Sequence, residues 1–158
     1  HRTEWPSASD LRDAAGAWGP VSAVFLNIIT PLPLPVAEVE VNNALATAQF
    51  INVFPSQVSG TMNSFVRTER SDTDFFRITL PAGRTLTAEL RPNASSDYNL
   101  EILDANGVAL AASTLGTGQV DIASSTNASG APVTVYVRIS YAGGIKGLAG
   151  TYTLLLQN

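Results

Sequence analysis

Ser71-Asp72-Thr73-Asp74-Phe75-Phe76-Arg77-Ile78-Thr79-Leu80 is the stretch of this 158-residue sequence that decides its fold. Two carboxylates, two residues apart, lead into a segment in which polar and apolar residues alternate. Successive side chains of a strand point to opposite faces, so Phe76, Ile78 and Leu80 share one face and Arg77 the other. The stretch therefore predicts a half-buried strand with acidic residues at its start.

The same alternation recurs as far as the C-terminus, in short runs divided by Gly, Pro, Asn and Asp. A short helix or a loop is predicted at residues 43–50. One apolar face per strand requires two sheets that cover each other, so the sequence predicts an all-β, jelly-roll-like antiparallel β-sandwich. The eight predicted strands lie near residues 58–62, 74–80, 84–91, 97–104, 108–113, 118–123, 132–140 and 150–156.

Two turns are predicted to close β-hairpins. Pro81-Ala82-Gly83 provides a glycine for the positive-φ position of a tight connection, and Asp104-Ala105-Asn106-Gly107 places Asn-Gly where a hairpin loop needs it. In the last predicted strand, Tyr152 is in phase with Leu154 and Leu156. We therefore expect Tyr152 to belong to the core.

The beginning of the chain has a different character. A short helix is expected within the first 20 residues, and the apolar segment Val21–Thr30 reads as a strand or as a segment covered by another domain. The three prolines of the segment 31–35 predict an extended, polyproline-like spacer. We interpret residues 1–36 as an N-terminal tail or interdomain linker, and residues 37–158 as the β-sandwich.

Composition argues against several classes of function. The nine Lys and Arg residues are scattered and the net charge is −4, which argues against nucleic-acid binding. Cysteine is absent and the single histidine is His1, so nucleophilic catalysis with an imidazole base and zinc binding lack their residues. The longest apolar run falls short of the roughly 18 residues of a transmembrane helix, so no membrane span is predicted.

A second group of oxygen-bearing side chains, Glu38-Val39-Glu40-Val41-Asn42-Asn43, follows the prolines. We hypothesise that it meets Asp72 and Asp74 in space, because carboxylates at such spacing can close on a cation. Calcium takes six to eight oxygen ligands, which four carboxylates and one or two amides can largely supply. The alternative is that the aspartates only shape a turn while the glutamates lie on a solvated strand face.

The order of these motifs resembles that of the bacterial pre-peptidase C-terminal domain, a family that includes the collagen-binding domains of clostridial collagenases. The resemblance covers about residues 37–158. The motifs that carry it are, in order, Glu-x-Glu-x-Asn-Asn, Ser-Asp-Thr-Asp-Phe-Phe, Pro-Ala-Gly-Arg-Thr-Leu, Tyr-Asn-Leu-Glu-Ile-Leu-Asp-Ala-Asn-Gly, Val-Tyr-Val-Arg-Ile and Gly-Thr-Tyr-Thr-Leu.

The resemblance implies a jelly-roll-like accessory domain of a secreted bacterial peptidase, which assists substrate binding or secretion and maturation. It also implies an extracellular location, a preceding catalytic domain, and calcium at the junction of linker and sandwich. Two residues depart from the family pattern: Val41 stands where proline is common, and Asn43 stands where calcium-binding members tend to have aspartate. The calcium ligands that the resemblance implies are Glu38, Glu40, Asn42, Asn43, Asp72 and Asp74.

A protein partner, such as collagen or another extracellular protein, is expected to bind at Tyr136, Arg138 and Tyr141. Aromatic residues and arginine are enriched at binding hot spots, and collagen-binding relatives use tyrosines on a sheet face. The alternative is that these are ordinary surface residues.

We also considered catalysis by Asp97 and Glu101, as in glycoside hydrolysis, but predict no enzyme. A carbohydrate-binding or cell-surface adhesion module is the alternative function.

Overall fold

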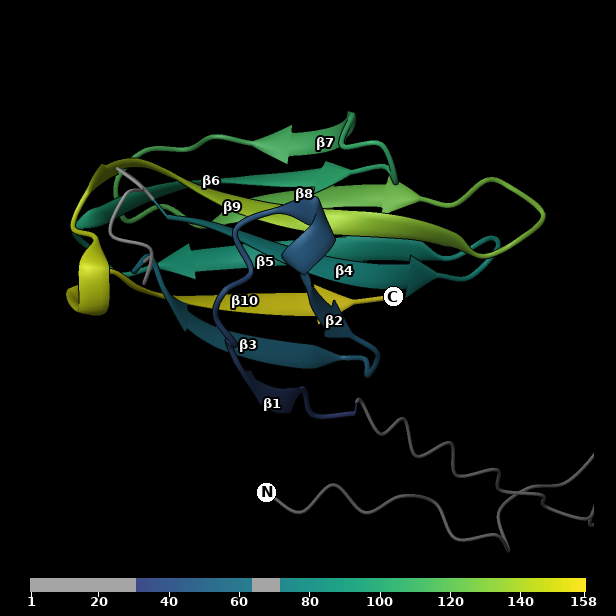
Figure 1. The fold of residues 1–158 in the computed structure, drawn as a ribbon, viewed down its shortest axis with the longest axis horizontal. Helices are drawn as coiled ribbons and strands as arrows, with labels where there is room; N and C mark the ends of the chain where they lie inside the picture. Colours follow the sequence, from purple (N-terminus) through teal and green to yellow (C-terminus); the bar gives the residue numbers. More distant parts are fainter. Residues whose placement is uncertain (1–30, 64–71) are drawn as a thin grey trace, which may run out of the picture. The chain divides into compact units, whose positions relative to one another are not determined.

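The computed structural model describes residues 31–63 and 72–158, which form two β-sheets packed face to face (Figure 1). The helix expected in the first 20 residues, the segment Val21–Thr30, and Ser71 lie outside the described residues. Two 3-10 turns, η2 (Leu45–Thr47) and η3 (Gly147–Ala149), connect strands. The strands are β1 (Leu34–Ala37), β2 (Gln49–Ile51), β3 (Ser56–Thr61), β4 (Thr73–Leu80), β5 (Thr85–Pro92), β6 (Ser96–Leu103), β7 (Ala109–Ser113), β8 (Asp121–Thr126), β9 (Val133–Gly144) and β10 (Thr151–Gln157).

The two sheets confirm the predicted all-β sandwich. One sheet has the strand order β1-β3-β10-β5-β8, and the other has the order β2-β4-β9-β6-β7. The eight predicted strands correspond to β3–β10. Two further strands, β1 and β2, pair in parallel with β3 and β4 and make both sheets mixed. Strand β1 lies partly within the predicted proline spacer, and it tolerates Pro35 because an edge strand leaves one side without ladder partners.

The first predicted hairpin is wrong. Strands β4 and β5 belong to different sheets, so the Pro81–Gly83 connection carries the chain across the sandwich. Gly83 does adopt the expected positive φ, 72°. The tight turn does reverse the chain. However, β4 and β5 then pack their apolar faces against each other across the core, instead of pairing side by side in one sheet.

The second hairpin is confirmed. Strands β6 and β7 pair antiparallel, and Gly107 has a φ of 82°. Asp104 organises the turn, since its Oδ1 accepts hydrogen bonds from the backbone N–H groups of Asn106 and Val108, both at 2.8 Å. This local hydrogen bonding is what an aspartate at the start of a turn is suited to make.

The core lies between the inward faces of the two sheets. Phe76, Ile78 and Leu80 of β4 are at most 1% exposed, and Tyr152 of β10 is 3% exposed, which confirms both predictions. Asp74 occupies the next inward position of β4 and is 0% exposed. An aspartate therefore stands where the alternation calls for an apolar side chain.

The segment 38–48 closes one edge of the sandwich. It carries the chain from β1, at the edge of one sheet, to β2, at the edge of the other. The crossing segment also contacts β4, because the backbone N–H of Phe75, the residue after Asp74, donates to the carbonyl of Asn42 at 3.0 Å. Within residues 31–63 and 72–158, no helix has the length and apolar character to cross a bilayer.

We predict that Phe76→Ala lowers the free energy of unfolding by about 3–5 kcal/mol, because it removes a ring that is 0% exposed. Chemical denaturation measures this loss. Thr79→Ala is the matched control on the exposed face of the same strand and should change stability by no more than about 0.5 kcal/mol. Equal losses in the two variants would contradict the assigned faces of β4.

Candidate metal centre

Three carboxylates converge at the edge that the crossing segment closes. Glu38 and Glu40 come from this segment and Asp74 from β4, and one oxygen of each lies within 4.8 Å of the others. Two oxygens that bind one calcium ion, each at 2.3–2.6 Å, can be at most about 5 Å apart. We call these three residues, with Asn42 and Asp72, the acidic cluster.

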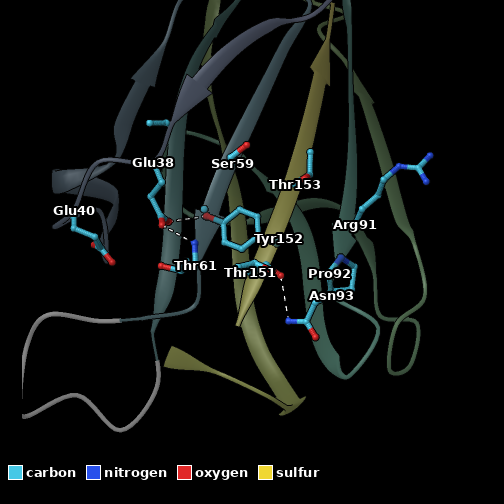
Figure 2. Close-up of a pocket in the computed structure, with 12 residues that line it drawn as sticks. Glu38, Glu40, Ser59, Thr61, Arg91, Pro92, Asn93, Thr151, Tyr152 and Thr153 are labelled. Carbon is cyan, nitrogen blue, oxygen red and sulfur yellow. Dashed lines mark hydrogen bonds between the residues drawn. The ribbon is translucent and has the colours of Figure 1, made fainter. Parts of the chain in front are cut away.

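The hydroxyl of Tyr152 lies between two members of the cluster. Its oxygen is 2.6 Å from Glu38 Oε1 and 2.7 Å from Asp74 Oδ2, and the contact to Glu38 is visible in Figure 2. A phenol carries one proton and can donate to only one carboxylate at a time. If both carboxylates are ionised, one accepts the hydrogen bond from the phenol, and an oxygen of the other faces the phenol oxygen with no hydrogen between them. The arrangement therefore calls for one more positive charge, either a proton or a cation.

Asn42 adds an amide to the cluster. Its side chain is 0% exposed and lies 3.2 Å from both Asp74 Oδ1 and Glu40 Oε2. An amide nitrogen at this position donates to both carboxylates. An amide oxygen at this position places three oxygens around one point, which is the arrangement of ligands around a cation.

Asp72 is the second buried carboxylate of the cluster, at 3% exposure. Its Oδ1 accepts a hydrogen bond from the backbone of Thr73 at 3.1 Å, but its Oδ2 has no hydrogen-bond partner among the described residues. A bound water or ion is one partner that can satisfy such a buried atom. The four carboxylates of the cluster present oxygen ligands, which suit calcium better than zinc.

The cluster holds Asp72 and Asp74 in an environment that disfavours charge. Burial, together with repulsion from Glu40 and Glu38, raises the pKa of Asp72 to about 7. Burial also raises the pKa of Asp74 far above its ordinary value, and Glu38 adds to this effect. The ion pairs between described residues, Arg91 with Glu89 and Arg138 with Glu101, involve neither Asp72 nor Asp74. A divalent cation would displace the protons that Asp72 and Asp74 otherwise hold.

Solved structures place this architecture among known folds. The pre-peptidase C-terminal domain of collagenase from Bacillus anthracis aligns with a TM-score of 0.53, over 70% of this chain and 94% of that domain, at 12% sequence identity. The chain has the fold of a pre-peptidase C-terminal domain. The resemblance noted in the sequence is thus confirmed in the fold.

The other comparisons add no argument. A β-glucosidase from Paenibacillus barengoltzii aligns over 89% of this chain and 14% of its own length, with a TM-score of 0.29 and 11% identity, which is too low to bear on the fold. Comparison of the sequence with protein-family models and with curated proteins gives no match.

Within the pre-peptidase C-terminal fold, the predicted metal ligands have different positions. Glu38, Glu40, Asn42 and Asp74 meet, and Asp72 is buried close enough to be affected by the charges of the two glutamates. Asn43 follows Asn42 in the same segment and is half-buried. Sequence reasoning placed Tyr152 in the core but missed its contact with the cluster. The signal was present, because a buried tyrosine usually has a hydrogen-bond partner for its hydroxyl.

The three residues predicted to bind a partner do not share one surface. Tyr136 and Arg138 alternate with buried residues of β9 and lie on the outer face of their sheet, where Arg138 pairs with Glu101. Tyr141 has the opposite phase. Its ring packs 6.4 Å from that of Tyr98, and its hydroxyl donates to the carbonyl of Gly144.

An open hollow of about 770 Å³ borders the acidic cluster (Figure 2). Its floor is the outer face of β3, β10 and β5, and one wall is the segment after β1. Glu38 and Glu40 belong both to the cluster and to this wall. We call this space the polar hollow and define it by six of its lining residues: Glu38, Glu40, Ser59, Thr61, Arg91 and Thr153.

We predict that the stability of the metal-free protein falls as the pH rises from about 4 to about 7. The pKa of Asp72 is higher in the folded state than its ordinary value of 3.8, so folding takes up a proton in this range and is favoured at its acid end. The raised pKa of Asp74 extends the fall into the alkaline range. Denaturant unfolding across this pH range measures the effect.

Asp72→Asn removes one titrating group and should flatten the fall between pH of about 4 and 7. Asp104→Asn is the control, because hydrogen bonds lower the pKa of Asp104, so its loss cannot produce the same flattening. Stability of the metal-free protein that rises across this range would contradict the proposed charge state of the cluster.

Proposed function

We propose that this chain carries a non-catalytic accessory domain of a secreted bacterial peptidase. In this proposal the domain is stabilised by calcium and assists either the binding of a protein substrate or the secretion and maturation of the enzyme. The observation that carries the proposal is the meeting of Glu38, Asp74 and Tyr152 at one edge of a pre-peptidase C-terminal fold. An extracellular location belongs to the same proposal.

The proposed ion joins parts of the chain that are distant in sequence. Glu38, Glu40 and Asn42 would bind it from the segment that crosses between the sheets, and Asp72 and Asp74 from the start of β4. When bound, calcium would place two positive charges among these carboxylates, of which Asp72 and Asp74 are buried. Its binding free energy then adds to the stability of the folded state, because the unfolded chain does not hold the ligands together.

A non-catalytic role is supported by the residues available for chemistry. Cysteine is absent from the sequence, and its one histidine is His1, far in sequence from the sandwich. The carboxylate of Glu101, which was considered together with Asp97 for glycoside hydrolysis, is paired with Arg138. The carboxylate that such a reaction would need as acid or nucleophile is therefore engaged in an ion pair.

We propose that a protein substrate such as collagen docks on the outer face of the β2-β4-β9-β6-β7 sheet. Tyr136 on β9 lies opposite Arg77 on β4, and Arg138 follows two residues later on the same face. The guanidinium of Arg77 lies 4.9 Å from the centre of the Phe50 ring, on the adjacent strand β2. This combination of aromatic and arginine side chains is typical of binding hot spots.

We predict that calcium raises the melting temperature of chelator-treated protein. At a concentration 100 times the Kd, a ligand that binds only the folded state adds about 2.7 kcal/mol, which is a rise of roughly 5–15 °C for a domain of this size. Differential scanning calorimetry measures it. Glu38→Gln and Asp74→Asn should each abolish most of this rise.

Glu101→Gln is the matched control, because it removes a carboxylate that is paired with Arg138 on the outer face of the β2-β4-β9-β6-β7 sheet, away from the acidic cluster. Its melting temperature should respond to calcium as the unmodified protein does. A melting temperature that stays constant up to millimolar calcium would refute the calcium part of the proposal.

We predict that Tyr136→Ala weakens retention on insoluble collagen by about 30-fold, which corresponds to a hot-spot loss of roughly 2 kcal/mol. Thr134→Ala, two residues earlier on the same face of β9, should bind as the unmodified protein does. Co-sedimentation with collagen fibrils measures both. Equal retention of the two variants would exclude Tyr136 as a contact.

A further inference from the structure

The polar hollow and the acidic cluster share two residues. Glu38 and Glu40 are half-exposed, whereas Asp74 and Asn42 on the inner side are fully buried. A cation held by these groups would therefore be shielded on the side of the core and open on the side of the hollow. Calcium takes six to eight oxygens, so positions on the open side remain for water or for oxygens of a ligand.

The floor of the hollow presents hydroxyl groups in register. Thr153 of β10 lies between Ser59 of β3 and Arg91 of β5, and Thr151 lies opposite Thr61. Adjacent strands are about 4.8 Å apart, so these side chains form a closely spaced polar surface. A hydroxyl group both donates and accepts hydrogen bonds. This surface is therefore complementary to a ligand that itself carries several hydroxyl groups.

Other ligand classes fit the hollow less well. Its floor is made of β3, β10 and β5, which are inner strands of the sheet. Where β3 extends beyond β1, the backbone N–H of Thr61 donates to Glu38 Oε2. The hollow therefore does not present a sheet edge to which a peptide could add as a further strand. Arg91, the basic residue that lines the hollow, is paired with Glu89, which leaves it less suited to hold a phosphate group.

We infer that the polar hollow binds a carbohydrate. Adjacent hydroxyl groups of one sugar complete the coordination of the calcium ion beside Glu38 and Glu40, and the rest of the ligand forms hydrogen bonds with Ser59 and Thr153. This inference rests on the proposed calcium site, but it assigns that site a ligand in addition to its role in stability. It predicts binding that requires calcium.

A glycan microarray probed with the full chain tests the inference, once in calcium and once in excess chelator. We expect binding to a set of glycans in calcium and its loss in chelator. The double variant Ser59→Ala with Thr153→Val should lower the affinity for these glycans about tenfold or more, since it removes two hydrogen bonds. The double variant Ser124→Ala with Thr126→Val removes two hydroxyls from the same sheet face outside the hollow and should bind normally.

Calorimetry of the same samples separates this inference from the proposed function. A calcium-dependent rise in melting temperature without glycan binding would overturn the carbohydrate site and leave the calcium site intact. Glycan binding that persists in chelator, or that is equal in the two double variants, would also overturn the inference. The absence of any response to calcium would overturn both proposals.

Discussion

The contact of one tyrosine hydroxyl with two carboxylates is the constraint on which the rest of the structure depends. Tyr152 comes from β10 in one sheet, Asp74 from β4 in the other, and Glu38 from the segment that crosses between them. The hydroxyl therefore joins three parts of the chain at the edge where the sandwich closes. Because it has a single proton, this junction is complete only with an additional positive charge.

The position of Asp74 explains why the junction couples fold and ion binding. The residue is in phase with Phe76 and Ile78, so its carboxylate is directed into the core by the same backbone geometry that buries the aromatic and aliphatic side chains. Burying a charge without a partner is costly. A movement of β4 that brought Asp74 into solvent would also expose the apolar residues of the strand. The charge of the carboxylate is therefore neutralised in place, by a bound proton or by a cation.

The two outer faces of the sandwich differ in chemistry, which separates the two proposed binding functions in space. One face carries Tyr136, Arg138 and Arg77, and the other carries the hydroxyl groups of β3 and β10 beside the acidic cluster. Strand alternation produces this division, since residues that do not face the core must face solvent. A protein substrate and a second ligand could therefore bind the same domain without competing for one surface.

The sequence by itself determined the strands and their buried faces, because the period-2 pattern and the turn residues are local properties of the chain. It also indicated that Glu38 and Glu40 belong with Asp72 and Asp74. Only the tertiary structure decided which strands pair. The turn at Pro81–Gly83 joins two sheets instead of closing a hairpin, and the short edge strands β1 and β2 depend on neighbours distant in sequence. Likewise, the hydroxyl of Tyr152 contacts Glu38, which is 114 residues away in the sequence. The packing of the two sheets determines such a contact, and no local sequence pattern predicts it.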